Sequence, residues 1–98
     1  MVQVNWLKSA RDDLKDIYEY ISLDSKRYAR LQIEKIQKSV ELLKNSPEIG
    51  RKIPEFFELD IREIIEGNYR IIYRILDGNT IDILLVHHSA RDLSSRIK

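Results

Sequence analysis

Hydrophobic and polar positions alternate with period two at the start of the chain and with helical spacing directly afterwards. In the segment VQVNW every second residue is apolar, which predicts a first β-strand. Two amphipathic helices are predicted next, because apolar residues then recur at steps of three and four. We expect Ser9 to be the N-cap of the first helix, and the second helix to begin near Asp24 or Ser25. The two apolar stripes are Ala10, Leu14, Ile17 and Ile21, and Ala29, Ile33, Ile36, Val40 and Leu43.

The two helices are predicted to form an antiparallel hairpin, because only the short segment SLDS separates them. The second helix is expected to end at NSPEIG, where Pro47 cannot continue it. Three strands are predicted after it, at 59–65, 69–76 and 80–87, with the turn signals EGN and DGN between them. The expected fold is α+β: an N-terminal strand, the helical hairpin and a three-stranded antiparallel meander. The strands form one sheet with the helices on one face, followed by a short C-terminal segment.

The register of the last strand pair is predicted from its charges. If DGN is a three-residue loop, Leu76 lies opposite Thr80 and Arg74 lies opposite Asp82, and the apolar residues share one face. A two-residue loop would mix charges into that face. The same rule, applied to the EGN turn, leaves Glu63 as an unexplained charge in the apolar row. The face towards the helices is expected to hold Leu59, Ile61, Ile65, Tyr69, Ile71, Tyr73, Ile75, Ile81, Ile83, Leu85 and His87.

The other face of the predicted sheet combines arginines with apolar residues. It is expected to hold Arg62, Ile64, Arg70, Ile72, Arg74, Asp82, Leu84, Val86 and His88. An apolar patch surrounded by arginines on a small domain favours a partner-binding surface. The hydrophobic core is expected between the helices and the first face, with Trp6, Leu14, Ile17, Ile33, Ile36, Val40, Ile71, Tyr73, Ile83 and Leu85 in it.

The amino-acid composition excludes several kinds of functional site. The 98 residues are expected to form one domain, 1–98, and the net charge of +1 argues neither for nor against nucleic acid binding. The absence of cysteine excludes disulfides, cysteine-ligated metals and thiol catalysis, and fits a cytoplasmic protein. Two histidines argue against a conventional metal site, and no cofactor is expected. No apolar run is long enough to span a bilayer, and the first residues lack the apolar core of a signal peptide.

Four segments resemble the toxin subunits of the RelE/ParE superfamily of type II toxin–antitoxin systems. ARDDLKDIYEYIS resembles the first helix of that family and NSPEIGRKIPE its inter-element loop. IREIIEGNYRIIYRI resembles its central hairpin, and IDILLVHHSARDL its last strand and C-terminal segment. The resemblance implies a cytoplasmic, growth-inhibiting toxin of the plasmid stabilisation type. Its implied partner is a small cognate antitoxin, in a toxin–antitoxin hetero-oligomer.

The resemblance leaves two targets open. The ParE branch implies an inhibitor of DNA gyrase that acts by binding, and the PEIGR loop and long helices are more similar to that branch. The RelE branch implies a ribosome-dependent, metal-independent mRNA endoribonuclease (an mRNA interferase). A non-toxic homologue that only binds an antitoxin is the third alternative.

Candidate site residues differ between these functions. Arg70, in NYRIIY, matches the arginine that many nucleases of the superfamily use against the phosphate. Arg62, Arg91 and His88 are the other residues expected to take part in cleavage. His88 is the better acid–base candidate of the two histidines, and a hydrogen bond that orders the following turn is its alternative role. The alternative interpretation of the arginines is structural, with Arg74 paired to Asp82 across the strands. Under the binding function, the expected contact residues are Arg62, Ile64, Arg70, Ile72, Arg74, Leu84, Val86 and Arg91.

One departure from the family pattern argues against cleavage. The nucleases often carry a tyrosine, histidine or lysine cluster near the end of the last strand or just after it, whereas here that segment reads SARDLSSRIK. Arg91 supplies a cation in this segment, but cations alone do not transfer protons. The sequence therefore favours a protein-binding toxin.

Overall fold

The computed structural model describes residues 2–56 and 59–89. Strand β1 (Gln3–Trp6) leads into helices α1 (Lys8–Ser22) and α2 (Lys26–Leu42). A short 3-10 turn η1 (Pro47–Ile49), a two-residue strand β2 (Arg51–Lys52) and a second turn η2 (Pro54–Phe56) follow. Strands β3 (Ile61–Glu66), β4 (Tyr69–Asp77) and β5 (Thr80–His88) complete the described fold. None of the described helices has the length and apolar character needed to cross a membrane.

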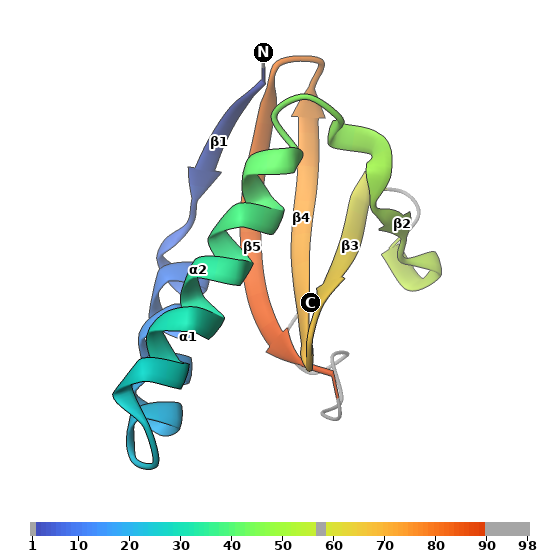
Figure 1. Ribbon diagram of the computed structural model, residues 1–98. Helices are drawn as coiled ribbons and strands as arrows, with labels where there is room; N and C mark the ends of the chain where they lie inside the picture. The colour runs from blue at the N-terminus through green and yellow to red at the C-terminus, as the bar shows by residue number, and fades with distance from the viewer. Residues whose placement is uncertain (1, 57–58, 90–98) are drawn as a thin grey trace.

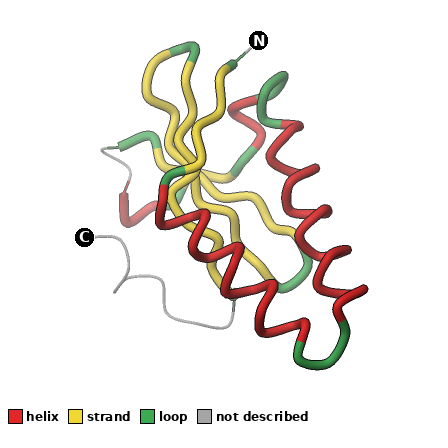
Figure 2. The backbone as a smooth tube through the Cα atoms, turned by 90° about the vertical axis from the view of Figure 1, so that its left-hand side faces the viewer, coloured by secondary structure: helices red, strands yellow, loops and turns green. Residues whose placement is uncertain are grey.

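The strands form one mixed sheet with the order β1-β5-β4-β3-β2. Strand β1 is parallel to β5, and the remaining neighbours are antiparallel. The helical hairpin lies along one face of the sheet, and its turn extends past the ends of the strands (Figure 1). In the view at right angles the two helices converge on the loop that joins them, which lies at the lower right, past the ends of the strands (Figure 2). The predicted α+β fold is therefore confirmed, whereas β2 was not predicted.

The two helices begin differently. Helix α2 has the predicted N-cap, because the Ser25 hydroxyl accepts a hydrogen bond of 3.1 Å from the backbone N–H of Tyr28. Helix α1 begins two residues earlier than predicted, after Leu7, and has no side-chain cap. The prediction of Ser9 as N-cap is wrong, because its hydroxyl donates instead to the carbonyl of Leu84, at 2.6 Å. A side chain assigned to a local cap thus connects α1 to β5.

The sheet carries a hydrophobic cluster on each face. The larger cluster lies under the helices and includes the predicted core residues Ile17, Ile36, Val40, Ile71, Tyr73 and Ile83, with Trp6, Leu14 and Ile33 partly buried against it. A smaller cluster on the other face consists of Ile53, Ile61, Ile72 and Leu85, with Phe56 and Leu84 packed against it. Leu85 is buried as predicted, but it belongs to the second cluster.

Candidate functional site

The sheet face away from the helices, here called the second face, differs from the predicted one because of two register changes. The first concerns β3. Glu66 pairs with Tyr69, so the turn between β3 and β4 contains two residues, Gly67 and Asn68, and Gly67 has φ +60°. This left-handed conformation favours glycine and suits a two-residue hairpin loop. The three-residue interpretation of this turn was wrong, and every side chain of β3 lies on the face opposite to the predicted one.

The second change is a β-bulge at Leu84. Tyr73 pairs with Ile83 but Ile72 pairs with Leu85, so β5 contains one extra residue at that point. The bulge is stabilised by α1: Ser9 donates to the Leu84 carbonyl, and an Asp13 carboxylate oxygen accepts from the backbone N–H of Val86, at 2.9 Å. Side chains of β5 beyond the bulge therefore lie on the face opposite to the predicted one.

The bulge reverses the predicted roles of the two histidines. His88 pairs with Tyr69 on the helix side, where the two rings meet edge to face at 5.5 Å between centroids. His87 pairs with Arg70 on the second face and is buried. The prediction that His88 shares the arginine face was therefore wrong, as was the placement of His87 in the main core.

The turn after β4 is also shorter than predicted. Asp77 pairs with Thr80, so the loop contains only Gly78 and Asn79, and the backbone N–H of Asn79 donates to the Asp77 carboxylate at 3.0 Å. A register shift between Ile75 and Asp77 restores the pairing of Arg74 with Asp82, which was predicted. The two side chains form no ion pair within 4.0 Å in the described chain.

Glu63 is the centre of the second face. Its side chain is only 3% exposed. One carboxylate oxygen accepts from Arg70 Nε at 2.5 Å, and the other accepts from Arg51 through both Nε, at 3.2 Å, and Nη2. The charge that had no explanation in the predicted register is thus the partner of two arginines, one from β4 and one from β2.

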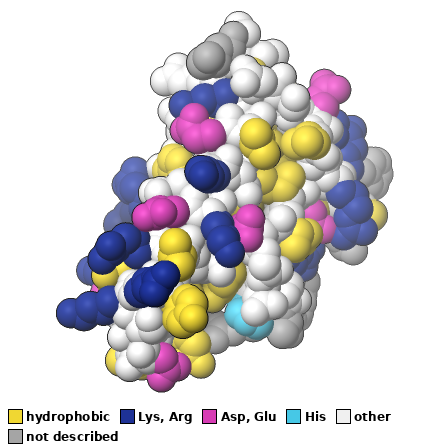
Figure 3. All heavy atoms as spheres, viewed as in Figure 1, with side chains coloured by type: hydrophobic (Ala, Val, Ile, Leu, Met, Phe, Trp, Pro, Cys, Tyr) yellow, Lys and Arg dark blue, Asp and Glu magenta, His cyan; other side chains and the backbone are white. Residues whose placement is uncertain are grey.

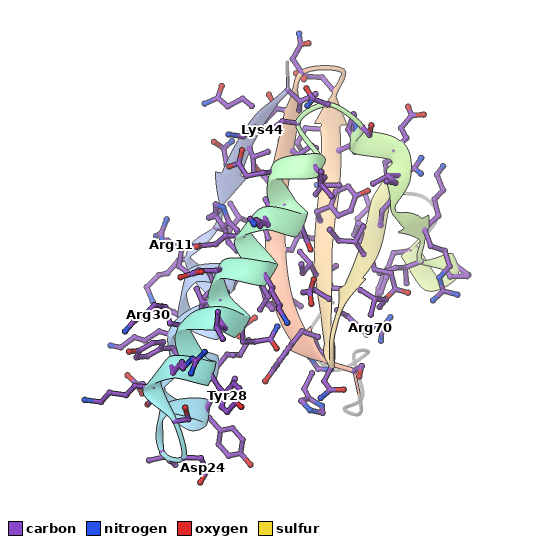
Figure 4. The ribbon with its side chains drawn as sticks, viewed as in Figure 1. Arg11, Asp24, Tyr28, Arg30, Lys44 and Arg70 are labelled. Carbon is purple, nitrogen blue, oxygen red and sulfur yellow. The ribbon has the colours of Figure 1, made fainter. Side chains whose placement is uncertain are left out.

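The electrostatics of this cluster favour the ionised carboxylate. Burial by itself raises the pKa of Glu63, but the hydrogen bonds from Arg70 and Arg51 outweigh burial, and the pKa lies below its ordinary value. The Arg70 side chain is 20% exposed and that of Arg51 is 73% exposed. Figure 4 shows Arg70 beside the sheet, well apart from the labelled hairpin residues Tyr28 and Arg30. Two arginines and one carboxylate leave a net positive charge on the second face.

A second group of polar contacts holds residues 47–50, here called the 47–50 loop. The Tyr73 hydroxyl donates to the Pro47 carbonyl at 2.7 Å and accepts from the backbone N–H of Gly50 at 2.9 Å. Arg62 Nη1 donates to the carbonyls of Glu48 and Gly50, both at 3.1 Å. Burial raises the pKa of the Tyr73 phenol, so the hydroxyl remains protonated as a donor. Side chains of the sheet therefore set the path of this loop.

The predicted site residues do not form one surface. Arg70, Ile72 and Arg74 lie on the second face as predicted, and Leu84 packs against its cluster. Arg62, Ile64 and Val86 lie on the helix side, so their predicted placement was wrong, and Arg91 lies outside the described residues. Sequence reasoning missed Glu63 and Arg51. The signal for Glu63 was its charge within an otherwise apolar row. A two-residue turn would have placed the Glu63 side chain on the face of Arg70.

The remaining charges do not define another site. Basic side chains are spread over the hairpin surface (Figure 3), and Arg27, Arg30, Lys35 and Lys38 of α2 are all exposed. Among residues 2–56 and 59–89, no group of three or more histidines, aspartates and glutamates is placed to hold a metal ion. The chemical capacity of the described site is thus charge recognition by arginine beside an apolar cluster.

Comparisons with known proteins identify the family. The model of a family described as the ParE toxin of the type II toxin–antitoxin system parDE matches residues 4–93. A structure of the chromosomal ParDE toxin–antitoxin system from P. aeruginosa has a similar fold, with a TM-score of 0.72 and 23% identity, over 90% of this chain and 96% of that chain. The toxin–antitoxin complex RelBE2 from Mycobacterium tuberculosis has a TM-score of 0.62 and 25% identity, over 89% of this chain and 96% of that chain.

A search of curated protein sequences gives no match. The family model, however, covers nearly all of the 98 residues, and both solved structures have a similar fold over most of their length. The chain therefore belongs to the ParE toxin family of type II toxin–antitoxin systems.

Proposed function

We propose that this protein is a growth-inhibiting toxin of the plasmid stabilisation type that acts in the cytoplasm by binding and inhibiting DNA gyrase. The observation that carries the proposal is the match to the ParE toxin family over residues 4–93. A small cognate antitoxin is the second proposed partner. Both solved structures are described as toxin–antitoxin systems or complexes, which supports a hetero-oligomer of the two proteins.

The second face supports binding over RNA cleavage. Cleavage needs a base for the ribose 2′-hydroxyl and an acid for the leaving oxygen. Of the two histidines, His88 contacts Tyr69 on the helix side, and His87 is buried opposite Arg70. Arg70 itself is engaged by Glu63. Within the described residues, the arginine cluster is therefore suited to recognising a charged surface and has no exposed acid–base pair beside it.

Expression of the protein alone tests the proposal. We expect growth to stop, an SOS response to appear and plasmid supercoiling to fall, with growth restored when the cognate antitoxin is produced. Rapid mRNA cleavage at codon boundaries, without loss of supercoiling, would instead assign the endoribonuclease activity. Unimpaired growth at a high level of folded protein would identify a non-toxic homologue that only binds an antitoxin.

A further inference from the structure

The 47–50 loop presents a large apolar side chain to solvent. Ile49 is 62% exposed, and Leu42, at the end of α2, is 64% exposed. Two backbone hydrogen bonds connect them through Ser46, whose N–H donates to the Leu42 carbonyl and whose carbonyl accepts from the Ile49 N–H, each at 3.2 Å. In Figure 3 hydrophobic side chains are visible at the upper right of the molecule and also over the lower part of the hairpin. Single exposed apolar residues are common, so exposure alone assigns no role.

The support of this loop distinguishes it from other exposed apolar segments. Tyr73 and Arg62 together bind the backbone of Pro47, Glu48 and Gly50 through four hydrogen bonds of 2.7 to 3.1 Å. These bonds from the sheet hold the backbone of the loop in the conformation that presents Ile49. A contact made by a rigid loop avoids the entropic cost of ordering side chains and backbone on association.

The turn of the helical hairpin offers a direct comparison. Leu23 is even more exposed than Ile49, at 82%. The hydrogen bonds of its turn all come from the hairpin itself. Backbone bonds run from Leu23 to Tyr20 and from Ser25 to Ile21, and the hydroxyls of Ser22 and Ser25 bond to backbone groups of the hairpin. No side chain of the sheet supports it among the described contacts. Exposure is thus shared by both turns, whereas external support is specific to the 47–50 loop.

The charges next to the loop indicate the chemistry of its partner. Arg51 and Lys52 follow the loop directly, and both are exposed. Arg51 is 73% exposed even though it contacts Glu63, and Lys52 forms no ion pair with any residue of the described chain. Glu48 is the one acidic residue of the loop. An apolar side chain beside two exposed cations is complementary to an apolar pocket bordered by carboxylates.

We propose that the 47–50 loop docks the toxin onto its protein target, with Ile49 entering an apolar pocket whose rim carries carboxylates. This inference rests on the proposed function, because it assigns the surface by which a binding toxin contacts that target. Leu42 extends the apolar contact, and Arg51 and Lys52 meet the acidic rim. Tyr73 and Arg62 are positioning residues, since they hold the backbone that presents Ile49.

The first test compares Ile49→Asp with the matched variant Leu23→Asp. We expect Ile49→Asp to lower target affinity at least about tenfold and to abolish growth inhibition, as loss of a buried interface anchor does. Both variants should unfold at the same urea concentration as the wild type, and both should bind the antitoxin. Leu23→Asp should remain toxic. Full toxicity of folded Ile49→Asp would overturn the inference, and so would a parallel loss of antitoxin binding or of self-association, which would assign the loop to those contacts.

The second test asks whether Tyr73 acts through the loop. Tyr73→Phe removes the hydroxyl that holds Pro47 and Gly50 and should weaken target binding several-fold in the wild-type background. In the Ile49→Ala background the same change should have little further effect, because the side chain that the loop presents is already absent. Equal effects in both backgrounds would show that Tyr73 acts only on stability, and would contradict its positioning role. Growth inhibition without a change in gyrase activity would reject gyrase as the target, whereas the comparison of variants would still decide the role of the loop.

Discussion

Replacement of Glu63 by glutamine tests the centre of the second face. The substitution preserves the shape of the side chain and removes its charge. Arg70 loses the carboxylate that its Nε contacts at 2.5 Å, and Arg51 loses the same partner. Because the Glu63 side chain is only 3% exposed, water cannot reach position 63 to replace these contacts.

The expected cost follows from the different exposure of the two arginines. Removing one partner of a fully buried ion pair typically costs about 3–5 kcal/mol. Arg70 keeps access to solvent, at 20% exposed, and glutamine still offers an amide oxygen as acceptor. Arg51 is 73% exposed, so its contribution resembles that of a surface pair, about 0–1 kcal/mol. We therefore expect Glu63→Gln to lower the free energy of unfolding by about 2–3 kcal/mol at neutral pH.

Urea unfolding followed by the fluorescence of Trp6, the only tryptophan, measures this cost. The matched control is Asp12→Asn, which removes the exposed Lys8–Asp12 pair and should leave the free energy of unfolding almost unchanged. The pKa of Glu63 is lowered in the folded state, so its contribution is complete above the unfolded pKa, about 4.3, and disappears as pH falls through the folded value. The difference between wild type and Glu63→Gln should therefore shrink in acid. A loss below about 0.5 kcal/mol at neutral pH, or a difference independent of pH, would refute this assignment.

Substitutions at Gly50, Tyr73 and Arg70 test other contacts of the site. Gly50→Ala should cost about 1–3 kcal/mol, because its Cβ would meet the Tyr73 hydroxyl and approach the Glu63 carbonyl to 2.8 Å. Gly78→Ala, whose Cβ meets nothing within 4 Å, should be nearly neutral in the same urea titration, and equal costs would contradict the close packing at Gly50. Tyr73→Phe should cost about 1–3 kcal/mol through the unpaired backbone groups of Pro47 and Gly50. Burial raises the folded pKa of Tyr73, so wild-type stability should fall as pH rises above about 10, and an equally steep fall in Tyr73→Phe would contradict this. Arg70→Ala should destabilise more than Arg70→Lys, which keeps a cation for Glu63, and Arg70→Ala should abolish growth inhibition; a folded and fully toxic alanine variant would exclude Arg70 from the working surface.

The helices and the order of the elements could be predicted because the helical spacing of apolar residues indicates which positions are buried. The stripes of α1 and α2 and the Ser25 cap are local features, and each was visible in a few adjacent residues. Ser9 was misassigned because its real partner, the Leu84 carbonyl, is 75 positions away in the sequence. Local preference favoured a cap, and a tertiary contact determined the actual role of the hydroxyl.

The faces of the sheet were only partly predictable, since one extra residue in a strand moves every side chain beyond it to the other face. The bulge at Leu84 lies in the continuous apolar run ILLV, where alternation gives no sign of a shift. Its stabilisation depends on Ser9 and Asp13, which no pattern within β5 indicates. At the preceding turn the sequence did carry a signal. Glu63 was the residue that disagreed with the predicted register, and the register was at fault.

A supercoiling assay with purified components tests the central claim most directly. The protein is added to DNA gyrase, ATP and relaxed plasmid, and in parallel to ribosomes translating a defined mRNA. The claim that it is a gyrase-binding toxin predicts loss of supercoiling in the first reaction, reversal by the antitoxin, and intact mRNA in the second. Undiminished supercoiling together with cleavage of the translated mRNA would contradict it.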